Sequence, residues 1–399
     1  MLALACAGCG SGSSAGGNGG TSGQPGTGGA TGSGGLGTGG SPGQGGSPAT
    51  GGIGGTRAGA GGVSATGGDA GAAAGGGRSG TGGVAAGGAS GSAGAGSSTG
   101  GAGGVAGSAG SSAPLVPAHG ALLGAFVGTG TLASFESTVA RKVAINHLFM
   151  GWGDDWTAQL PGLAAGERIP MVTWEPWTNG SVGAPLANIT GGSYDAMITA
   201  RANASKSFGQ KFFLRWGHEM NGNWYPWDGS HNGANAGAAT TYISAYRHIH
   251  DLFVAAGASN VVWIFCPNVD SVPNDAWNQW SNYYPGDSYA DWIGVDGYNW
   301  GTVQTGSTWR TFSAIFGGIY SGLAAKGKPI IIPETASTED GGDKGAWIAA
   351  ILPALESSFP AIKALVWFQM NKETDWRVDS SPAALSGFIR ITKDPYFNP

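Results

Sequence analysis

Eight short apolar runs recur along the second part of the chain, each bounded by polar residues, Gly or Pro. Their residues are 121–128, 143–150, 169–174, 211–216, 261–266, 291–298, 328–333 and 363–368. Most of these runs are continuously apolar rather than alternating, which is typical of strands covered on both faces. The pattern therefore predicts eight strands of a buried, parallel β-sheet.

Segments with helical character separate the predicted strands, and 193–208 and 239–257 are the clearest of them. In the second segment, apolar residues recur at three- and four-residue spacing, as on the buried face of an amphipathic helix: Tyr242, Tyr246, Ile249 and Phe253. A strand followed by a helix, repeated eight times, predicts an α/β fold of the (β/α)8 TIM-barrel type. A doubly wound parallel sheet alternates in the same way, so periodicity alone does not decide between the two.

The composition divides the chain into two parts. Residues 1–112 hold 47 of the 79 glycines and no Phe, Trp or Tyr. A segment with so few side chains to bury does not offset the entropy cost of ordering, so we expect a disordered Gly/Ser/Ala-rich linker over 10–112. The remainder, 113–399, contains all 16 Trp and is long enough for one catalytic barrel domain.

The charge and the cysteine content bear on the partners and the location of the protein. The net charge is −5 without any run of Lys and Arg, which argues against a nucleic-acid partner. The first nine residues, MLALACAGC, resemble the end of a bacterial lipoprotein signal. We therefore expect a truncated signal over 1–9, membrane attachment through a lipid on Cys9 or Cys6, and an extracellular or cell-surface location, as for an outer-membrane lipoprotein. No basic region precedes the apolar run, so a plain secretion signal and a chance similarity stay open. Cys266, in a predicted strand, is expected to be a buried structural thiol.

Polar and aromatic residues follow the carboxyl ends of the predicted strands. They are Trp174, Glu175, Trp177, His218, Glu219, Asn268, Asp296, Tyr298, Trp300, Glu334, Trp367 and Gln369. In a (β/α)8 barrel these strand ends meet at one face, and that face carries the active site. The arrangement favours the barrel over the doubly wound sheet.

Two carboxylates stand out among these residues, Glu219 after the fourth predicted strand and Glu334 after the seventh. A lone Glu after a strand is most often a surface or salt-bridged residue, but a pair flanking one site is what glycosidic cleavage requires. Flat aromatic rings suit the apolar faces of sugars, and about half of the nearby tryptophans are expected to face a cleft rather than the core. These tryptophans are Trp174, Trp177, Trp224, Trp227, Trp300, Trp367 and Trp376.

The stretch FLRWGHEMNGNWYPW, at 213–227, resembles the acid/base signature of glycoside hydrolase family 26. The resemblance extends over 117–399 and implies a (β/α)8 barrel that cleaves β-glycans with retention of configuration. It implies that Glu219 is the acid/base and Glu334 the nucleophile. It further implies a site in which His218 precedes the acid/base, Trp224 contacts sugar, Tyr298 donates a hydrogen bond to the nucleophile, and Trp367 forms the floor of the cleavage subsite.

Several other residues are weaker candidates. Trp174, Asn268 and Trp300 are expected to bind substrate, and Glu175 either binds a sugar hydroxyl or pairs with an arginine. Arg215 and Asp296 are expected to support the site, with Arg215 as a structural partner that favours the ionised nucleophile. No second His lies at ligand spacing from His218, so we expect no metal and no cofactor.

Together these features predict a secreted or lipid-anchored, endo-acting retaining β-glycanase that works as a monomer on a β-linked polysaccharide. The substrate is expected to be β-1,4-mannan or mixed-linkage β-1,3-1,4-glucan, and the stretch WFQMNKETDWR resembles the family members that act on mixed-linkage glucan. A β-1,3-xylanase, a non-catalytic glycan-binding barrel, and a surface matrix protein that carries the barrel as a passenger remain alternatives.

Overall fold

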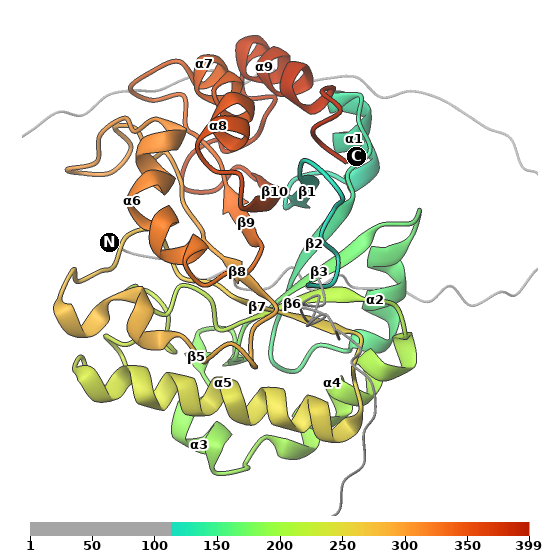
Figure 1. Ribbon diagram of the computed structural model, residues 1–399, viewed down its shortest axis with the longest axis vertical. Helices are drawn as coiled ribbons and strands as arrows, with labels where there is room; N and C mark the ends of the chain where they lie inside the picture. Colours follow the sequence, from blue (N-terminus) through green and yellow to red (C-terminus); the bar gives the residue numbers. More distant parts are fainter. Residues whose placement is uncertain (1–112, 399) are drawn as a thin grey trace, which may run out of the picture. The chain divides into compact units, whose positions relative to one another are not determined.

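The computed structural model describes residues 113–398. The predicted signal over 1–9, with Cys6 and Cys9, and the predicted linker over 10–112 lie outside the described residues. Within them, eight strands form a closed barrel with parallel neighbours in the order β1-β10-β9-β8-β7-β6-β3-β2 (Figure 1). The strands are β1 (Leu122–Val127), β2 (Ile145–Met150), β3 (Ile169–Trp174), β6 (Phe212–Trp216), β7 (Val261–Phe265), β8 (Trp292–Gly294), β9 (Ile330–Thr335) and β10 (Ile362–Gln369).

Each strand coincides with one of the eight predicted apolar runs, and the barrel is confirmed. Strand β1 pairs with β10 on one side and with β2 on the other, so the sheet closes on itself. A doubly wound sheet would leave two open edges, and that alternative is therefore wrong.

Helices cover the outside of the barrel (Figure 1). They are α1 (Leu132–Val139), α2 (Trp156–Ala164), α3 (Leu186–Thr190), α4 (Asp195–Phe208), α5 (Ala236–Ala256), α6 (Phe312–Ala324), α7 (Lys344–Ala349), α8 (Ile351–Ser357) and α9 (Pro382–Thr392). The apolar face predicted for α5 is buried, and Tyr242 stacks on Trp216 of β6 with 5.6 Å between ring centroids.

Two connections differ from a strict strand-helix repeat. Between β7 and β8 the chain forms two short 3-10 turns, η1 (Ala276–Asn278) and η2 (Trp280–Tyr283), in place of an α-helix. This connection is rich in Pro, Asn and Asp, which favour turns over helix interiors, so the expectation of eight helical connections was wrong here. After β3, an antiparallel hairpin of β4 (Trp177–Asn179) and β5 (Val182–Gly183) precedes α3.

Side chains on the strands alternate between two apolar layers. One layer fills the barrel interior with Ile145, Met171, Phe213, Val262, Ile264, Cys266, Trp292, Ile331, Ala364 and Val366. The intervening strand residues join a larger core beneath the helices. Because successive side chains of a strand point to opposite faces, a residue in phase with the interior layer points into the barrel. Cys266 is fully buried in this layer, as predicted.

Residues shortly before β1 close the amino-terminal end of the barrel. Leu115 and Val116 pack against the interior layer, and the indole of Trp292 donates a hydrogen bond to the carbonyl of Pro114 at 2.8 Å. The opposite end, where the strands reach their carboxyl termini, is left for the candidate site. No helix among residues 113–398 is both long enough and apolar enough to cross a bilayer.

Candidate active site

The turn after β6 holds Glu219 in an unusual backbone conformation. Gly217 and Glu219 both have φ of 55°, the left-handed region that a side chain disfavours. Hydrogen bonds secure the turn: the indole of Trp227 donates to the carbonyl of His218 at 2.8 Å, and the amide of Glu219 donates to the carbonyl of Cys266 at 2.8 Å. The structure therefore fixes the direction of the Glu219 side chain.

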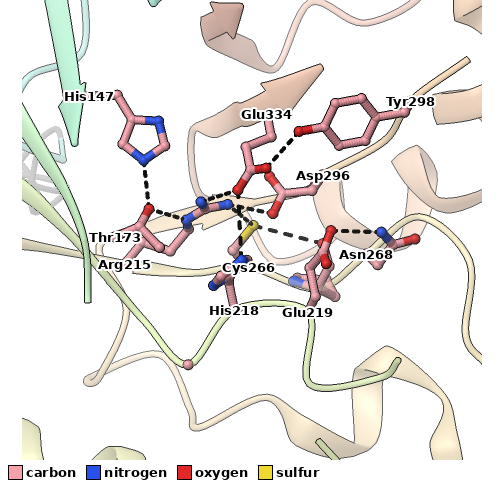
Figure 2. Close-up of polar contacts among 12 residues, drawn as sticks. His147, Thr173, Arg215, His218, Glu219, Cys266, Asn268, Asp296, Tyr298 and Glu334 are labelled. Atoms are coloured by element: carbon pink, nitrogen blue, oxygen red, sulfur yellow. Dashed lines mark hydrogen bonds and ion pairs between the residues drawn. The ribbon is translucent and has the colours of Figure 1, made fainter. Parts of the chain in front are cut away.

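Two side chains donate hydrogen bonds to the carboxyl group of Glu219. The indole of Trp224 donates to Oε2 at 2.7 Å. The amide of Asn268 donates to Oε1 at 2.8 Å (Figure 2). Burial, followed by the charge of Glu334, raises the pKa of Glu219 to about 7, although both donors oppose this shift. Near neutral pH both the protonated and the ionised form of this carboxyl group are therefore populated.

Glu334, at the end of β9, has different partners. The Arg215 guanidinium donates to its Oε1, and the Tyr298 hydroxyl donates to its Oε2 at 2.6 Å (Figure 2). The Nε2 atom of His218 lies 3.7 Å from Oε1. These contacts pair the carboxylate with a cation and orient both of its oxygens.

An irregularity in the sheet directs Glu334 inward. In β9, Ile331 faces the barrel interior whereas Ile330 and Ile332 face the helices, so strict alternation would send residue 334 outward. The register between β9 and β10 shifts after the Leu365–Ile332 pair, with an extra residue in β9. Such a bulge reverses the facing of the residues that follow it.

Arg215 is the centre of the buried polar network beneath the cavity. Its guanidinium also donates to Asp296, just after β8, and to the hydroxyl of Thr173 at 2.8 Å (Figure 2). Burial opposes the charge of this side chain, but Asp296 and Glu334 outweigh burial and raise the pKa of Arg215. The arginine is therefore a permanent cation beside Glu334.

Glu219 and Glu334 both line one cavity of about 400 Å³ at the carboxyl ends of the strands. Of the residues singled out from the sequence, Trp224, Asn268, Tyr298 and Trp300 also line it. Trp376 borders the cavity as well but is only 1% exposed, so two of the seven tryptophans expected near the site, Trp224 and Trp300, present an open ring there. Trp177 and Trp227 instead pack behind the wall, where Trp227 stacks on Tyr225 at 4.3 Å between ring centroids.

Two predicted substrate-binding tryptophans do not reach the cavity. Trp174 and Trp367 are fully buried beneath the helices, where Trp174 stacks on Trp152 at 4.5 Å and Trp367 packs on Phe388 of α9 at 5.3 Å. Both residues are out of phase with the interior layer of their strands. Their assignment to the sugar site was wrong because position at a strand end does not fix the facing of a side chain.

Other predicted residues lie just below the cavity surface. His218 and Asp296 are fully buried and contact Glu334 and Arg215 respectively. Glu175 is 4% exposed. Burial, then the charge of Glu334, raises the pKa of Glu175 to about 8, so its carboxyl group is protonated at neutral pH. Glu175 does not line the cavity, and the ion pairs of Arg215 go to Asp296 and Glu334 instead, so the structure supports neither role predicted for Glu175.

Three of these residues offer metal-ligating atoms within 4.8 Å of one another, namely His218, Asp296 and Glu334. The guanidinium of Arg215, however, already contacts both carboxylates. A fixed cation at this place neutralises the charge that a divalent ion would need and repels the ion. The donor set therefore does not fit a metal.

The sequence did not reveal several residues that line the cavity. They are Phe149, Tyr225, Asp270, Val272, Gln304, Gly306, Ser307, Thr308, Arg310, Phe368, Lys372 and Glu373. Phe149 and Phe368 are in phase with interior residues of β2 and β10, so strand alternation could have identified them. The others lie on loops, whose course no periodic pattern encodes.

Comparisons with known proteins agree with this barrel and its paired carboxylates. The family model described as glycosyl hydrolase family 26 matches residues 196–350, a range that contains both Glu219 and Glu334. Endoglucanase H of Acetivibrio thermocellus is 42% identical over 277 residues, which are 67% of this chain and 30% of that protein. A mannan endo-1,4-beta-mannosidase of Bacillus subtilis is 25% identical over 170 residues, 42% of this chain and 41% of the enzyme. The chain belongs to glycosyl hydrolase family 26.

Solved structures match the fold. The mannanase man26 of Bacillus subtilis superposes with a TM-score of 0.53 at 20% identity, covering 70% of this chain and 87% of that structure. A GH26 beta-mannanase from Bacteroides ovatus gives a TM-score of 0.53 at 15% identity, covering 70% and 90%. The chain spans less than half the length of the two curated relatives described above.

Proposed function

We propose that the protein is a retaining β-glycanase, a glycoside hydrolase that cleaves inside β-linked polysaccharides. One observation carries the proposal: two glutamates line the same cavity in contrasting surroundings. Glu219 has a pKa raised to about 7, whereas Glu334 contacts a permanent cation and a tyrosine hydroxyl. Two carboxyl groups with different environments are what an acid and a nucleophile require.

In the first step Glu334 attacks the anomeric carbon of the sugar while Glu219 gives its proton to the glycosidic oxygen. The bond between that carbon and the oxygen breaks, the leaving glycan departs as an alcohol, and a glycosyl ester forms on Glu334. Arg215 and Tyr298 keep the attacking carboxylate oriented through their hydrogen bonds. Retaining enzymes of this kind hold the two carboxyl groups about 5–5.5 Å apart.

In the second step Glu219, now ionised, accepts a proton from water, and the water oxygen attacks the anomeric carbon of the ester. Glu334 is released as a carboxylate and the product keeps its original configuration. The hydrogen bonds from Trp224 and Asn268 suit this role, because donors stabilise the charged form of Glu219 between the two steps.

For the substrate we favour a β-glucan backbone, with β-1,4-mannan as the second choice. The relative named endoglucanase H is 42% identical, compared with 25% for the mannan endo-1,4-beta-mannosidase of Bacillus subtilis and 28% over 134 residues for a beta-1,3-xylanase of a Vibrio species. The rings of Trp224 and Trp300, which are partly exposed in the cavity, offer apolar surfaces to sugar.

The test is hydrolysis of soluble barley β-glucan, lichenan, glucomannan, galactomannan and β-1,3-xylan, with product sizes measured by chromatography. We expect wild-type protein to release mixed oligosaccharides from β-glucan, and Glu219→Gln and Glu334→Gln to be inactive while still folded by circular dichroism. Glu356→Gln, at an exposed position of α8, serves as the matched control. Wild-type turnover by either active-site variant would reject the assignment.

The proposal extends to location and assembly. We propose that the protein works as a monomer outside the cell or at its surface, attached by a lipid on Cys9 or Cys6. The lipoprotein-like pattern at 1–9 supports the location. Fractionation of producing cells, with and without substitution of both cysteines by Ala, tests it, and protein found only in the cytosol would contradict it.

A further inference from the structure

The loop between β10 and α9 forms one wall of the cavity. Lys372, Glu373 and Trp376 of this loop line the cavity. Beneath the loop lies Lys344, the first residue of α7, whose side chain is completely buried. A lysine is rarely buried unless its charge has a specific partner, so its contacts identify its role.

The ammonium group of Lys344 donates three hydrogen bonds, and all three go to the loop. Its Nζ lies 2.9 Å from the carbonyl oxygen of Asp375, 2.7 Å from that of Arg377 and 2.9 Å from the hydroxyl of Ser380. An ammonium group has three N–H donors, so each of them is used. The two carbonyl groups belong to the residues on either side of Trp376.

The lysine occupies a place that does not favour its charge. The amino-terminal end of a helix carries a partial positive charge and favours acidic residues. Burial lowers the pKa of Lys344 to about 8, although nearby Glu339 and Asp375 act in the opposite direction. Lys344 therefore does not stabilise α7 through its charge, and we attribute its role to its contacts with the loop.

Trp376 connects the loop held by Lys344 to the candidate catalytic groups. Its ring centroid lies 5.0 Å from that of Tyr298 and 4.9 Å from that of Trp300. Tyr298 in turn donates its hydroxyl to Glu334. A displacement of the Trp376 backbone would therefore change the aromatic wall beside the nucleophile.

We propose that Lys344 is a positioning residue for glycan binding, which holds the backbone on both sides of Trp376 so that its buried ring supports Tyr298 and Trp300 in the cavity wall. The kinetic part of this inference rests on the proposed β-glycanase function. The structural part does not, because the order of the loop can be measured without any substrate.

The main test compares Lys344→Met with Lys206→Met as the matched control. Lys206 also donates to a backbone carbonyl, that of Ala256 at 3.1 Å, but it is exposed and belongs to α4. We expect Lys344→Met to raise KM about tenfold, because the cavity wall loses the packing of Trp376 behind Tyr298 and Trp300, with kcat changed less than about threefold. The control keeps both constants. An unchanged KM in Lys344→Met would overturn the proposal.

A double-substitution cycle tests whether the effect passes through Trp376. In the Trp376→Ala background, Lys344→Met should raise KM no further, because the ring that it positions is absent. An equal increase in both backgrounds would show that Lys344 acts elsewhere. If Lys344→Met does not fold, Lys344→Gln, which keeps two N–H donors, takes its place with the same expected directions.

Hydrogen exchange separates this inference from the proposed function. Amides within residues 370–380 should exchange faster in Lys344→Met than in wild type, whereas the amides of α5 should not change. Unchanged exchange in the loop would overturn the positioning role even if the wild type hydrolyses β-glucan. A wild type that hydrolyses no glycan, with faster loop exchange in the variant, would instead reject the β-glycanase proposal alone.

Discussion

Two hydrogen bonds influence the pKa of Glu219, and this pKa should determine how activity depends on pH. The indole of Trp224 and the amide of Asn268 donate to the two carboxyl oxygens at 2.7 and 2.8 Å. Both donors favour the ionised form, against burial and the charge of Glu334. Since Glu219 must be protonated to act as the acid, activity should fall as the pH rises through about 7.

Removing one donor should move this alkaline limit upward. A hydrogen bond to a charged group contributes about 1.5–3 kcal/mol, and 1.36 kcal/mol corresponds to one pKa unit. Water that enters the cavity replaces part of the lost bond, so we expect Trp224→Phe and Asn268→Ala each to raise the alkaline limit by about one pH unit.

The assay is kcat/KM for a soluble β-glucan, measured across the pH range at constant ionic strength. Trp277→Phe is the matched control, because the indole of Trp277 also donates to a carboxylate, Asp275 at 3.1 Å, but at an exposed position outside the cavity lining. Its profile should equal that of the wild type. An alkaline limit that stays in place or moves downward in both active-site variants would refute the acid role of Glu219.

Three further outcomes follow from the contacts. Tyr298→Phe removes the hydroxyl 2.6 Å from Glu334 and should lower kcat by about ten- to a hundredfold, since the nucleophile loses one orienting donor; steady-state kinetics with unchanged kcat would contradict this. Because the pKa of Glu219 is raised from 4.5 to about 7 in the folded protein, the stability it contributes is present at low pH and is lost as the pH rises between these values. Glu219→Gln should therefore gain about 3 kcal/mol relative to wild type at pH 8 compared with pH 4, and urea unfolding at both pH values that shows no such difference would reject the shift. Trp156→Ala, at a fully buried position beneath the helices, should lower the free energy of unfolding by about 3–5 kcal/mol, and a loss below about 1 kcal/mol in urea unfolding would argue against that packing.

The sequence by itself determined the architecture of the barrel. Each of the eight apolar runs became a strand, because short, continuously apolar runs are typical of a sheet covered on both faces. The three- and four-residue spacing of apolar residues likewise predicted the buried face of α5. The stretch around Glu219 was enough to indicate the family.

The placement of Glu334 required more than strand counting. Its position at the end of β9 was visible in the sequence, but its inward direction depends on a bulge between β9 and β10. Trp174 and Trp367 were wrongly predicted to bind substrate, because both lie at strand ends but face the helices. The facing of a residue depends on register with a neighbouring strand, which is set by contacts distant in sequence.

Only the tertiary structure decided how the cavity wall is built. Lys344 and Trp376 are 32 positions apart, and the lysine looks in the sequence like an ordinary surface residue at a helix start. Folding buries it under the loop and directs its three hydrogen bonds at the residues around Trp376. Hydrophobic periodicity is a property of residues that are close in sequence. The hydrogen-bond partners of buried polar groups depend instead on the closure of the barrel, because closure brings the loops of adjacent strands together.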